Sequence, residues 1–353
     1  MQRKLVVSPS PHLRNAKAST QGIMADVLLA LRPSALASVW IYGTQAAILI
    51  AVAVLSAVAA EGLYQRHAKQ RSTVSDLSAA VTGLLVAFNI PASAPWWLAM
   101  VGSVLAIVLV KQMFGGIGQN FINPALAART ILMLSWTGLM AANAVPLNGS
   151  WLTGAHSAVD AVAAATPLAS GVDAVASATQ APLSQSYTLW RLFSGDIPGM
   201  LGETCKLTLL LGGLYLIVRG VIDWRIPVSF IATVALLFYI KTGVFYSVES
   251  CSQNVLYQLL SGGLILGAFF MATDYVTSPM TGLGRVIMGV GCGVMLFVIR
   301  AYNTSYPEGC SFAILFLNIL TPLIDRYTKP RSFGVVKPPK PQKAQDQQEV
   351  KQA

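Results

Sequence analysis

The chain has 353 residues, of which 54% are hydrophobic and 11% are charged, and its formal net charge is +10. Water-soluble domains carry about 25% charged residues, so a soluble globular domain is excluded. The basic residues lie mostly in short segments between apolar runs and in the C-terminal tail. This pattern orients membrane proteins, so no nucleic-acid partner is expected.

Long apolar runs predict an all-α polytopic membrane protein, because roughly 20 apolar residues cross a bilayer as a helix. Ten spans are expected, with one long polar loop between the fifth and the sixth. The predicted spans are 22–40, 44–62, 74–91, 95–113, 124–142, 198–218, 226–242, 254–272, 283–300 and 308–324.

The distribution of lysine and arginine predicts the orientation. With the N-terminus in the cytoplasm, the outer segments hold only Arg191, Lys241 and Arg300, and the inner segments hold most of the other basic residues, including those of the N-terminus, of 63–73 and of the tail. This asymmetry satisfies the positive-inside rule. We therefore expect a multi-pass protein of the cell's inner membrane, with both termini cytoplasmic and the long loop on the outer face.

The predicted organisation has four parts: a first five-helix repeat (1–142), an outward-facing loop (143–197), a second five-helix repeat (198–325) and a basic, disordered tail (326–353). The tail is suited to contact anionic membrane lipids, or it is simply a solvated end.

An internal repeat relates the two helical parts. The sequence TGLLVAF at 82–88 in the third span resembles SGGLILGAF at 261–269 in the corresponding span of the second half. Because five spans are an odd number, the second half enters the membrane from the opposite side. This predicts two inverted five-helix repeats with broken helices, an arrangement found in many transporters.

The helix break between the fourth and fifth spans reads GGIGQNFINP at 115–124. Three glycines, two asparagines and a proline cannot continue a helix. Two interpretations stay open for Gln119, Asn120 and Asn123. Their side chains bind the polar edge of a flat ring system, or they satisfy backbone groups in a tight re-entrant turn.

Ionisable residues lie near span ends in the second half. Asp274 and Glu308 are either functional, as such groups often are near a membrane, or structural partners of Arg285 and Arg300. The four cysteines and three histidines lack the short spacings of metal or cluster ligands, so no metal site is predicted.

The long loop contains two similar motifs. DAVAAATPL runs from Asp160 to Leu168, and DAVASAT runs from Asp173 to Thr179. In each motif an acid lies six residues before a threonine, and small neighbours leave Thr166 or Thr179 accessible. An alanine-rich linker with ordinary threonines is the alternative interpretation, since short motifs match by accident.

Together these segments resemble a known family. The chain is similar to the D subunit of the Rnf electron-transport complex, which is related to the B subunit of sodium-pumping NADH:quinone oxidoreductase. The segments that carry the resemblance are SPSPHLR at 8–14, GGIGQN at 115–120 with Asn123 and Pro124, DAVAAATPL at 160–168, WRIPVSF at 224–230, LGAFFMATD at 266–274, YPEG at 306–309 and PLIDRYTKP at 322–330.

The resemblance implies a cofactor and partners. In this family a threonine of the loop motif carries FMN through a phosphoester bond, which makes it a phosphoprotein, and a separate flavin transferase installs the FMN. Thr166 keeps the following Pro-Leu of the family and is preferred over Thr179 as the acceptor, with Asp160 as part of the motif. Relatives also hold a non-covalent flavin, riboflavin or FMN, in the membrane part.

The implied function is electron transport inside an ion-translocating ferredoxin:NAD oxidoreductase complex, together with iron–sulfur and flavin subunits. The flavin supplies the redox chemistry, and the protein supplies placement and electrostatics. A solute channel or transporter of inverted-repeat type is the alternative from another class, and a structural scaffold for partner subunits is a third.

Overall fold

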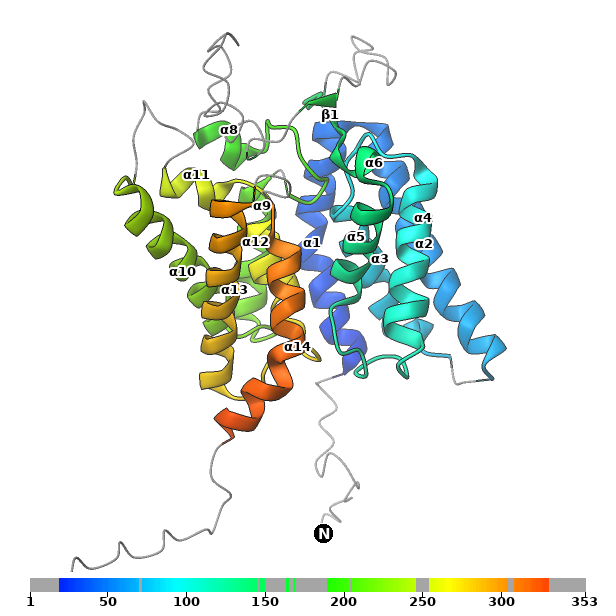
Figure 1. Cartoon of the computed structure of the whole chain (residues 1–353). Coiled ribbons are helices and arrows are strands. Elements are labelled where there is room, and N and C mark those ends of the chain that lie inside the picture. The colour runs from blue at the N-terminus through cyan, green and yellow to red at the C-terminus, as the bar shows by residue number, and fades with distance from the viewer. Residues whose placement is uncertain are drawn as a thin grey trace, which may run out of the picture.

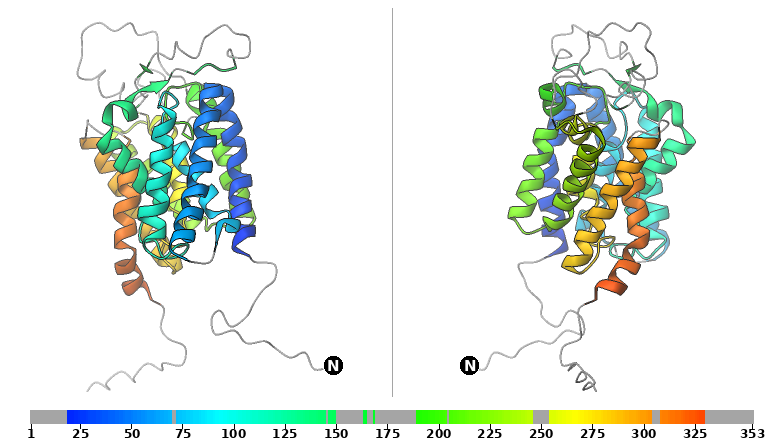
Figure 2. Two further views of the ribbon diagram at one scale, coloured as in Figure 1. Left: turned by 90° about the vertical axis from the view of Figure 1, so that its right-hand side faces the viewer. Right: turned by 60° about the vertical axis from the view of Figure 1, so that its left-hand side comes forward.

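The structure is a computed structural model, and it describes residues 19–69, 72–144, 146–149, 163–164, 168, 189–203, 205–245, 254–303 and 308–329. The described residues form a bundle of helices with one short two-stranded pair, β1–β2, at one end (Figures 1 and 2). The prediction of an all-α architecture is confirmed in this sense.

The elements have the following bounds: α1 Thr20–Tyr42, α2 Thr44–His67, η1 Val74–Asp76, α3 Ser78–Phe88, α4 Trp96–Leu105, η2 Ala106–Gln112, α5 Pro124–Ser135, α6 Thr137–Ala141, β1 Asn143–Ala144, β2 Ala163–Ala164, α8 Leu189–Ser194, α9 Lys206–Val218, α10 Arg225–Thr242, α11 Val255–Leu260, α12 Leu264–Leu266, η5 Gly267–Met271, α13 Gly282–Tyr302 and α14 Cys310–Thr328.

Five helices are long and apolar enough to cross a membrane: α1, α2, α10, α13 and α14. The other predicted spans coincide with shorter or interrupted helices. The span expected at 254–272 is divided into α11, α12 and η5, and the span expected at 198–218 is helical only from Lys206. A multi-pass helical protein is therefore established by these helices, while a count of ten spans is not.

The interruptions in these helices are of two kinds, π-helical segments and a glycine turn. α4 passes into the π-helix η2, and α12 passes into the π-helix η5. Between α11 and α12 the chain turns at Gly262, whose φ of 64° lies in the left-handed region that favours glycine. Irregular backbone of this kind is tolerated at membrane depth only where protein surrounds it.

Small residues allow close contacts between the two halves of the chain. α1 packs along α9, and a Cβ added at Gly212 would overlap the backbone carbonyl of Ala30. Within the second half, a Cβ at Gly213 would overlap the ring of Phe269. Close backbone approach through small residues is the usual basis of helix packing in membranes.

The two ends of the bundle differ. α1 begins and α14 ends at the lower end of the bundle in Figure 1, which we call the terminal end. β1, α8 and α11 lie at the opposite end, which we call the loop end (Figure 1). The described ends of the chain therefore share one end of the bundle, as the predicted topology requires.

The contact between α1 and α9 gives a stability prediction. We expect Gly212→Ala to lower the free energy of unfolding by about 1–3 kcal/mol, because the new methyl group meets a backbone carbonyl that cannot move aside. Gly138→Ala in α6 is the matched control, since nothing lies within 4 Å of a Cβ at that position. Thermal unfolding in detergent measures both, and equal midpoints would contradict the prediction.

Candidate cofactor sites

Both ends of the segment 143–197 are fixed to the end of α1. The backbone N–H groups of Leu147 and Asn148 donate to the carbonyl of Ile41, at 2.7 and 3.1 Å. From the other side, the hydroxyl of Tyr42 donates to the carbonyls of Ile197 and Gly199, at 3.1 and 3.2 Å. The base of the predicted loop is therefore closed at one place on the loop end.

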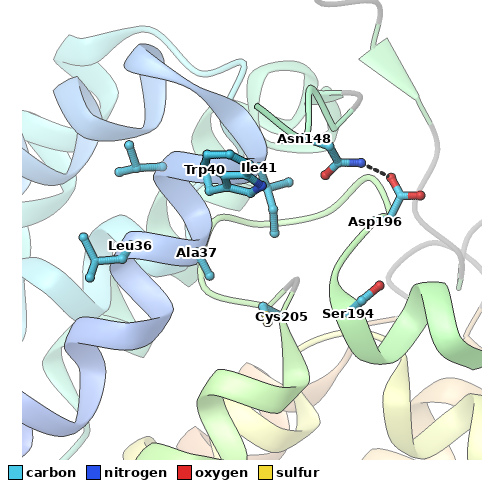
Figure 3. Close-up of a pocket in the computed structure, with 9 residues that line it drawn as sticks. Leu36, Ala37, Trp40, Ile41, Asn148, Ser194, Asp196 and Cys205 are labelled. Carbon is cyan, nitrogen blue, oxygen red and sulfur yellow. Dashed lines mark hydrogen bonds between the residues drawn. The ribbon is translucent and has the colours of Figure 1, made fainter. Parts of the chain in front are cut away.

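A cavity of about 720 Å³ lies beside this base (Figure 3). α1 forms one wall, where Trp40 is 55% exposed. On the opposite wall the amide of Asn148 donates to Asp196 at 2.6 Å, and Asp196 also accepts from Arg191 at 2.8 Å. The cavity thus combines an aromatic and aliphatic face with a fixed polar edge.

The first loop motif is held on both sides of its threonine. Ala164 of β2 pairs with Asn143, and Leu168 is buried. In the sequence, Thr166 lies two residues after Ala164 and two residues before Leu168. Asp160, Thr166 and Thr179 themselves lie outside the described residues.

A second cavity, of about 410 Å³, lies toward the terminal end. Its size is in the range of small-molecule and cofactor sites, and its wall is mostly apolar with a few polar groups. The residues that bring polar or aromatic groups to it are Thr20, Ser78, Thr82, Lys111, Asn120, Asn123, Phe269, Phe270, Thr273, Asp274 and Tyr275. Gln119 is exposed and is not among the lining residues.

The structure brings together two of the three polar residues singled out in the helix break. Asn123 caps α5, because its side-chain oxygen accepts from the N–H groups of Ala125 and Leu126, and its amide nitrogen donates to Met271 at 3.2 Å. Asn120 donates to Asp274 at 3.4 Å. Asn123 therefore satisfies backbone groups at the helix break, which was one of the two interpretations of this segment. Asn120 and Asn123 both also line the cavity.

Asp274 lies in the connection between η5 and α13, at the wall of this cavity. Burial raises the pKa of its carboxyl group, because the charged form loses water. Hydrogen bonds from the side chains of Asn120 and Thr277 act in the opposite direction, but burial is the larger effect. The carboxyl group therefore keeps its proton to a higher pH than a solvated aspartate.

A buried ion pair forms part of the cavity wall. The ammonium of Lys111 contacts both oxygens of Glu61, at 3.1 and 3.0 Å, and donates to Ser78 at 2.7 Å. Gln112 also donates to Glu61, at 2.9 Å. The sequence interpretation counted Lys111 only as an inner, orienting charge. The signal that it missed is Glu61, an acid inside an apolar span.

A larger charged group lies where the two halves meet. Arg129 of α5 pairs with Glu203 at 3.0 Å and with Glu308, and it donates to Asn89 at 2.9 Å. The expected pairing of Glu308 with Arg300 is therefore wrong, since its carboxylate reaches Arg129 from across the interface.

The other expected pair, Asp274 with Arg285, is also wrong. Arg285 pairs with Asp223 at 2.6 Å. Asp223 precedes α10 and accepts from the N–H of Arg225. Because Arg285 lies in the first turn of α13, the ion pair joins the start of α10 to the start of α13. Asp274, in contrast, turns its carboxylate toward Asn120 and Thr277.

Comparison with known proteins assigns the chain to a family. Residues 6–334 match the model of the NQR2, RnfD, RnfE family. The chain belongs to this family. The resemblance seen in the sequence motifs is thereby confirmed, and with the long apolar helices it identifies a multi-pass membrane protein.

Relatives in the NQR2, RnfD, RnfE family cover nearly the whole chain. The D subunit of the Na(+)-translocating ferredoxin:NAD(+) oxidoreductase complex of Acetobacterium woodii is 46% identical over 96% of this chain and 98% of its own length. The D subunit of the proton-translocating ferredoxin:NAD(+) oxidoreductase complex of Clostridium ljungdahlii is 38% identical over 93% of this chain and 96% of its own length. The D subunit of an ion-translocating oxidoreductase complex of Shigella boydii is 36% identical over 93% of this chain and 98% of its own length.

The Glu61–Lys111 pair gives a second prediction. Glu61→Ala leaves the ammonium of Lys111 buried without its carboxylate, and we expect a loss of about 3–5 kcal/mol in the free energy of unfolding. The double variant Glu61→Gln/Lys111→Met removes both charges and should lie much closer to the unaltered protein. Denaturant titration in detergent compares the two, and an equal loss in both variants would argue against an uncompensated charge.

Proposed function

We propose that this protein is the D-type membrane subunit of an ion-translocating ferredoxin:NAD oxidoreductase complex, in which it carries electrons through covalently bound FMN. The observation that carries the proposal is the near full-length similarity to the D subunits of such complexes. These relatives are named for sodium in one case and for protons in the other, so the proposal covers cation transport without choosing the ion.

Thr166 is the proposed acceptor of FMN. The described residues on either side support it, because β2 and the buried Leu168 hold the chain two residues before and two residues after this threonine. The base of the loop is closed on α1 at the loop end, through Leu147, Asn148 and Ile197. Thr179 lies eleven residues beyond Leu168 in the sequence and lacks the Pro-Leu that follows Thr166.

A bound flavin supplies reversible electron transfer, and the residues of the chain supply its placement. The exposed indole of Trp40 and the aliphatic wall of α1 offer an apolar face beside the loop base (Figure 3). The Asn148–Asp196 hydrogen bond fixes the opposite edge of the same cavity. These groups fit a tethered aromatic ring system that must keep one face out of water.

The cavity toward the terminal end is the proposed site of a second, non-covalent flavin, riboflavin or FMN. Phe269, Phe270 and Tyr275 supply aromatic contacts, and Asn120 supplies an amide for the polar edge of the ring. Its volume of about 410 Å³ suits a ligand of this size.

The proposed topology is ten spans in two inverted five-helix repeats. Matching contacts support it: α2 packs on α3 and α4 in the first half, and α10 packs on α13 and η5 in the second. The loop faces the outside of the inner membrane, and both termini, with the basic tail near the lipid headgroups, face the cytoplasm. The proposed partners are the iron–sulfur and flavin subunits of the complex and a flavin transferase during maturation.

A solute channel or transporter is the second candidate. The broken helices and the cavity between them favour it, because transporters bind substrates at such interruptions. Solute flux through liposomes that contain only this chain would support that candidate over the electron carrier.

The covalent flavin gives the central prediction. The denatured protein, from cells that possess the flavin transferase, should show flavin fluorescence in its gel band. Thr166→Val should abolish this fluorescence, because valine has no hydroxyl for the phosphoester, while the matched variant Thr179→Val should retain it. A dark band in the unaltered protein would overturn the proposed function, and a dark band in Thr179→Val alone would move the acceptor to Thr179.

The non-covalent site gives a further prediction. Asn120→Leu should weaken flavin retention roughly 2- to 10-fold, the effect of one lost hydrogen bond. Gln119→Leu is the matched control, since its side chain is exposed and outside the cavity lining. Flavin released on denaturation of Thr166→Val protein, which lacks the proposed covalent flavin, is quantified by fluorescence. Equal release from both variants would exclude Asn120 from the site.

A further inference from the structure

A third cavity, of about 440 Å³, lies where α10 and α13 begin, and the start of α13 is at the terminal end of the bundle (Figure 1). It adjoins the second cavity, because Val221 and Tyr275 line both, and the hydroxyl of Tyr275 donates to the carbonyl of Val221. The charged residues of its lining are Asp223, Arg225 and Arg285. We call it the basic cavity.

The basic cavity lies at the depth of the lipid headgroups. α10 and α13 are long and apolar enough to cross a membrane, and their first residues are Arg225 and Gly282. A span begins where the chain enters the hydrocarbon layer, so these residues mark its boundary. Two lining residues, Trp224 and Tyr275, are 56% and 53% exposed. Exposed tryptophan and tyrosine are enriched at this boundary.

The lining residues of the basic cavity carry one excess positive charge. Arg225 and Arg285 both pair with Asp223, at 4.0 and 2.6 Å, and Asp223 is the one acidic residue among the described lining residues. The side chains of the two arginines are 44% and 32% exposed. A ligand outside the protein can therefore reach both guanidinium groups.

The two arginines have hydrogen-bond donors to spare. Arg285 uses its Nε for the carbonyl of Pro279, at 3.1 Å, and its Nη1 for Asp223. Its Nη2 and the guanidinium of Arg225 donate to none of the described residues. A guanidinium has five N–H donors in a planar fork, which matches the oxygens of a phosphate.

The structure holds the two arginines at one place. The guanidinium of Arg225 lies against the first residue of α13, since a Cβ added at Gly282 would overlap it. Arg285 belongs to the first turn of the same helix. The N-terminal end of a helix carries partial positive charge and attracts anions, so it adds to the charge of the arginines.

Other acidic residues near the basic cavity lie outside its lining. Asp26 of α1 pairs with Arg219 at 3.0 Å. Asp274 turns its carboxyl group toward Asn120 in the wall of the second cavity. Asp325 of α14 accepts a backbone N–H that precedes α13, at 3.0 Å. In the described part of the chain, the ion pairs of the two cavity arginines go to Asp223 alone.

Apolar side chains lead from the basic cavity along the bundle surface. Leu214 and Val218 are one turn apart at the end of α9, and they are exposed. Val228 is exposed on α10, one turn after Trp224. A molecule with a charged head in the cavity would thus find apolar surface for a hydrocarbon tail on both helices.

We infer that Arg225 and Arg285 bind the phosphate of an anionic phospholipid whose acyl chains lie on the exposed apolar side chains of α9 and α10. The headgroup of phosphatidylglycerol carries one negative charge, which equals the excess positive charge of the lining. Basic pockets between transmembrane helices bind anionic headgroups in this way. The inference rests on the multi-pass helical architecture and does not depend on the proposed function.

Native mass spectrometry of the full chain in detergent tests the site. Titration with phosphatidylglycerol gives the Kd of the first bound lipid. Phosphatidylcholine with the same acyl chains should bind more weakly, because its choline neutralises the phosphate. Arg225→Gln should weaken the binding of phosphatidylglycerol about fivefold, the effect of one basic residue at a membrane surface, and leave that of phosphatidylcholine unchanged.

A second variant changes the affinity in the opposite direction. Asp223→Asn removes the carboxylate that competes with the phosphate, so phosphatidylglycerol should bind more tightly. Asparagine also accepts a backbone N–H at the start of a helix, as Asp223 does from Arg225, so this variant keeps the cap of α10. If Arg225→Gln does not fold, Asp223→Asn decides the question.

Arg66→Gln is the matched control. Arg66 is an exposed cation in the last turn of α2, and it does not line the basic cavity. This variant loses the same net charge and should keep the affinity of the unaltered protein. An equal loss in Arg66→Gln and Arg225→Gln would reduce the effect to net charge and overturn the inference.

Two other results would also overturn the inference. One is equal affinity of the unaltered protein for phosphatidylglycerol and phosphatidylcholine. The other is displacement of the first phosphatidylglycerol by millimolar inorganic phosphate, which would make the cavity a site for a free anion instead of a lipid. Both results leave the proposed function intact, because neither concerns the flavins.

Discussion

The contact on which the architecture depends is the guanidinium of Arg129 between two carboxylates. Arg129 belongs to α5 of the first half, Glu203 precedes α9, and Glu308 precedes α14. Separating the halves would leave these charges buried without partners, which costs several kcal/mol for each broken pair. The interface is therefore fixed in one arrangement, and both cavities are bounded by elements that this interface holds together.

The interrupted helices depend on two further charged side chains, Arg300 and Lys206, for a different reason. Where α11 ends and α12 begins, backbone carbonyls lose their helical partners, and at membrane depth water cannot replace them. Arg300 donates to the carbonyl of Ser261, and Lys206 donates to that of Gly262. In the first half, Asn123 performs the corresponding task at the start of α5. Polar residues in apolar segments thus stabilise the breaks that shape the cavities.

Hydropathy was sufficient to predict the helical, multi-pass architecture and most helix positions, because burial in lipid imposes long apolar runs. Glycine, asparagine and proline predicted the break at 115–124, and two of its three polar residues do line a cavity. The partners of the charged residues were not predictable in the same way. Arg129 lies 74 and 179 residues from its two carboxylates, and only the packing of the halves brings them together. The structural alternative paired Asp274 with Arg285 and Glu308 with Arg300, and both pairings were wrong.

The two candidate flavin cavities differ in the residues that line them, and this difference bears on what each can hold. Toward the terminal end, the charge of Lys111 is compensated by Glu61, so the cavity offers no uncompensated cation among its described residues for a phosphate. The cavity at the loop end is lined by one ionisable side chain among the described acidic and basic residues, Asp196, whose carboxylate pairs with Arg191 at 2.8 Å. On the proposed function, the phosphate-bearing flavin belongs at the loop end, because β2 and the buried Leu168 flank Thr166 in the sequence and lie at that end. The cavity toward the terminal end is better suited to an uncharged ring system held by amides and aromatic side chains.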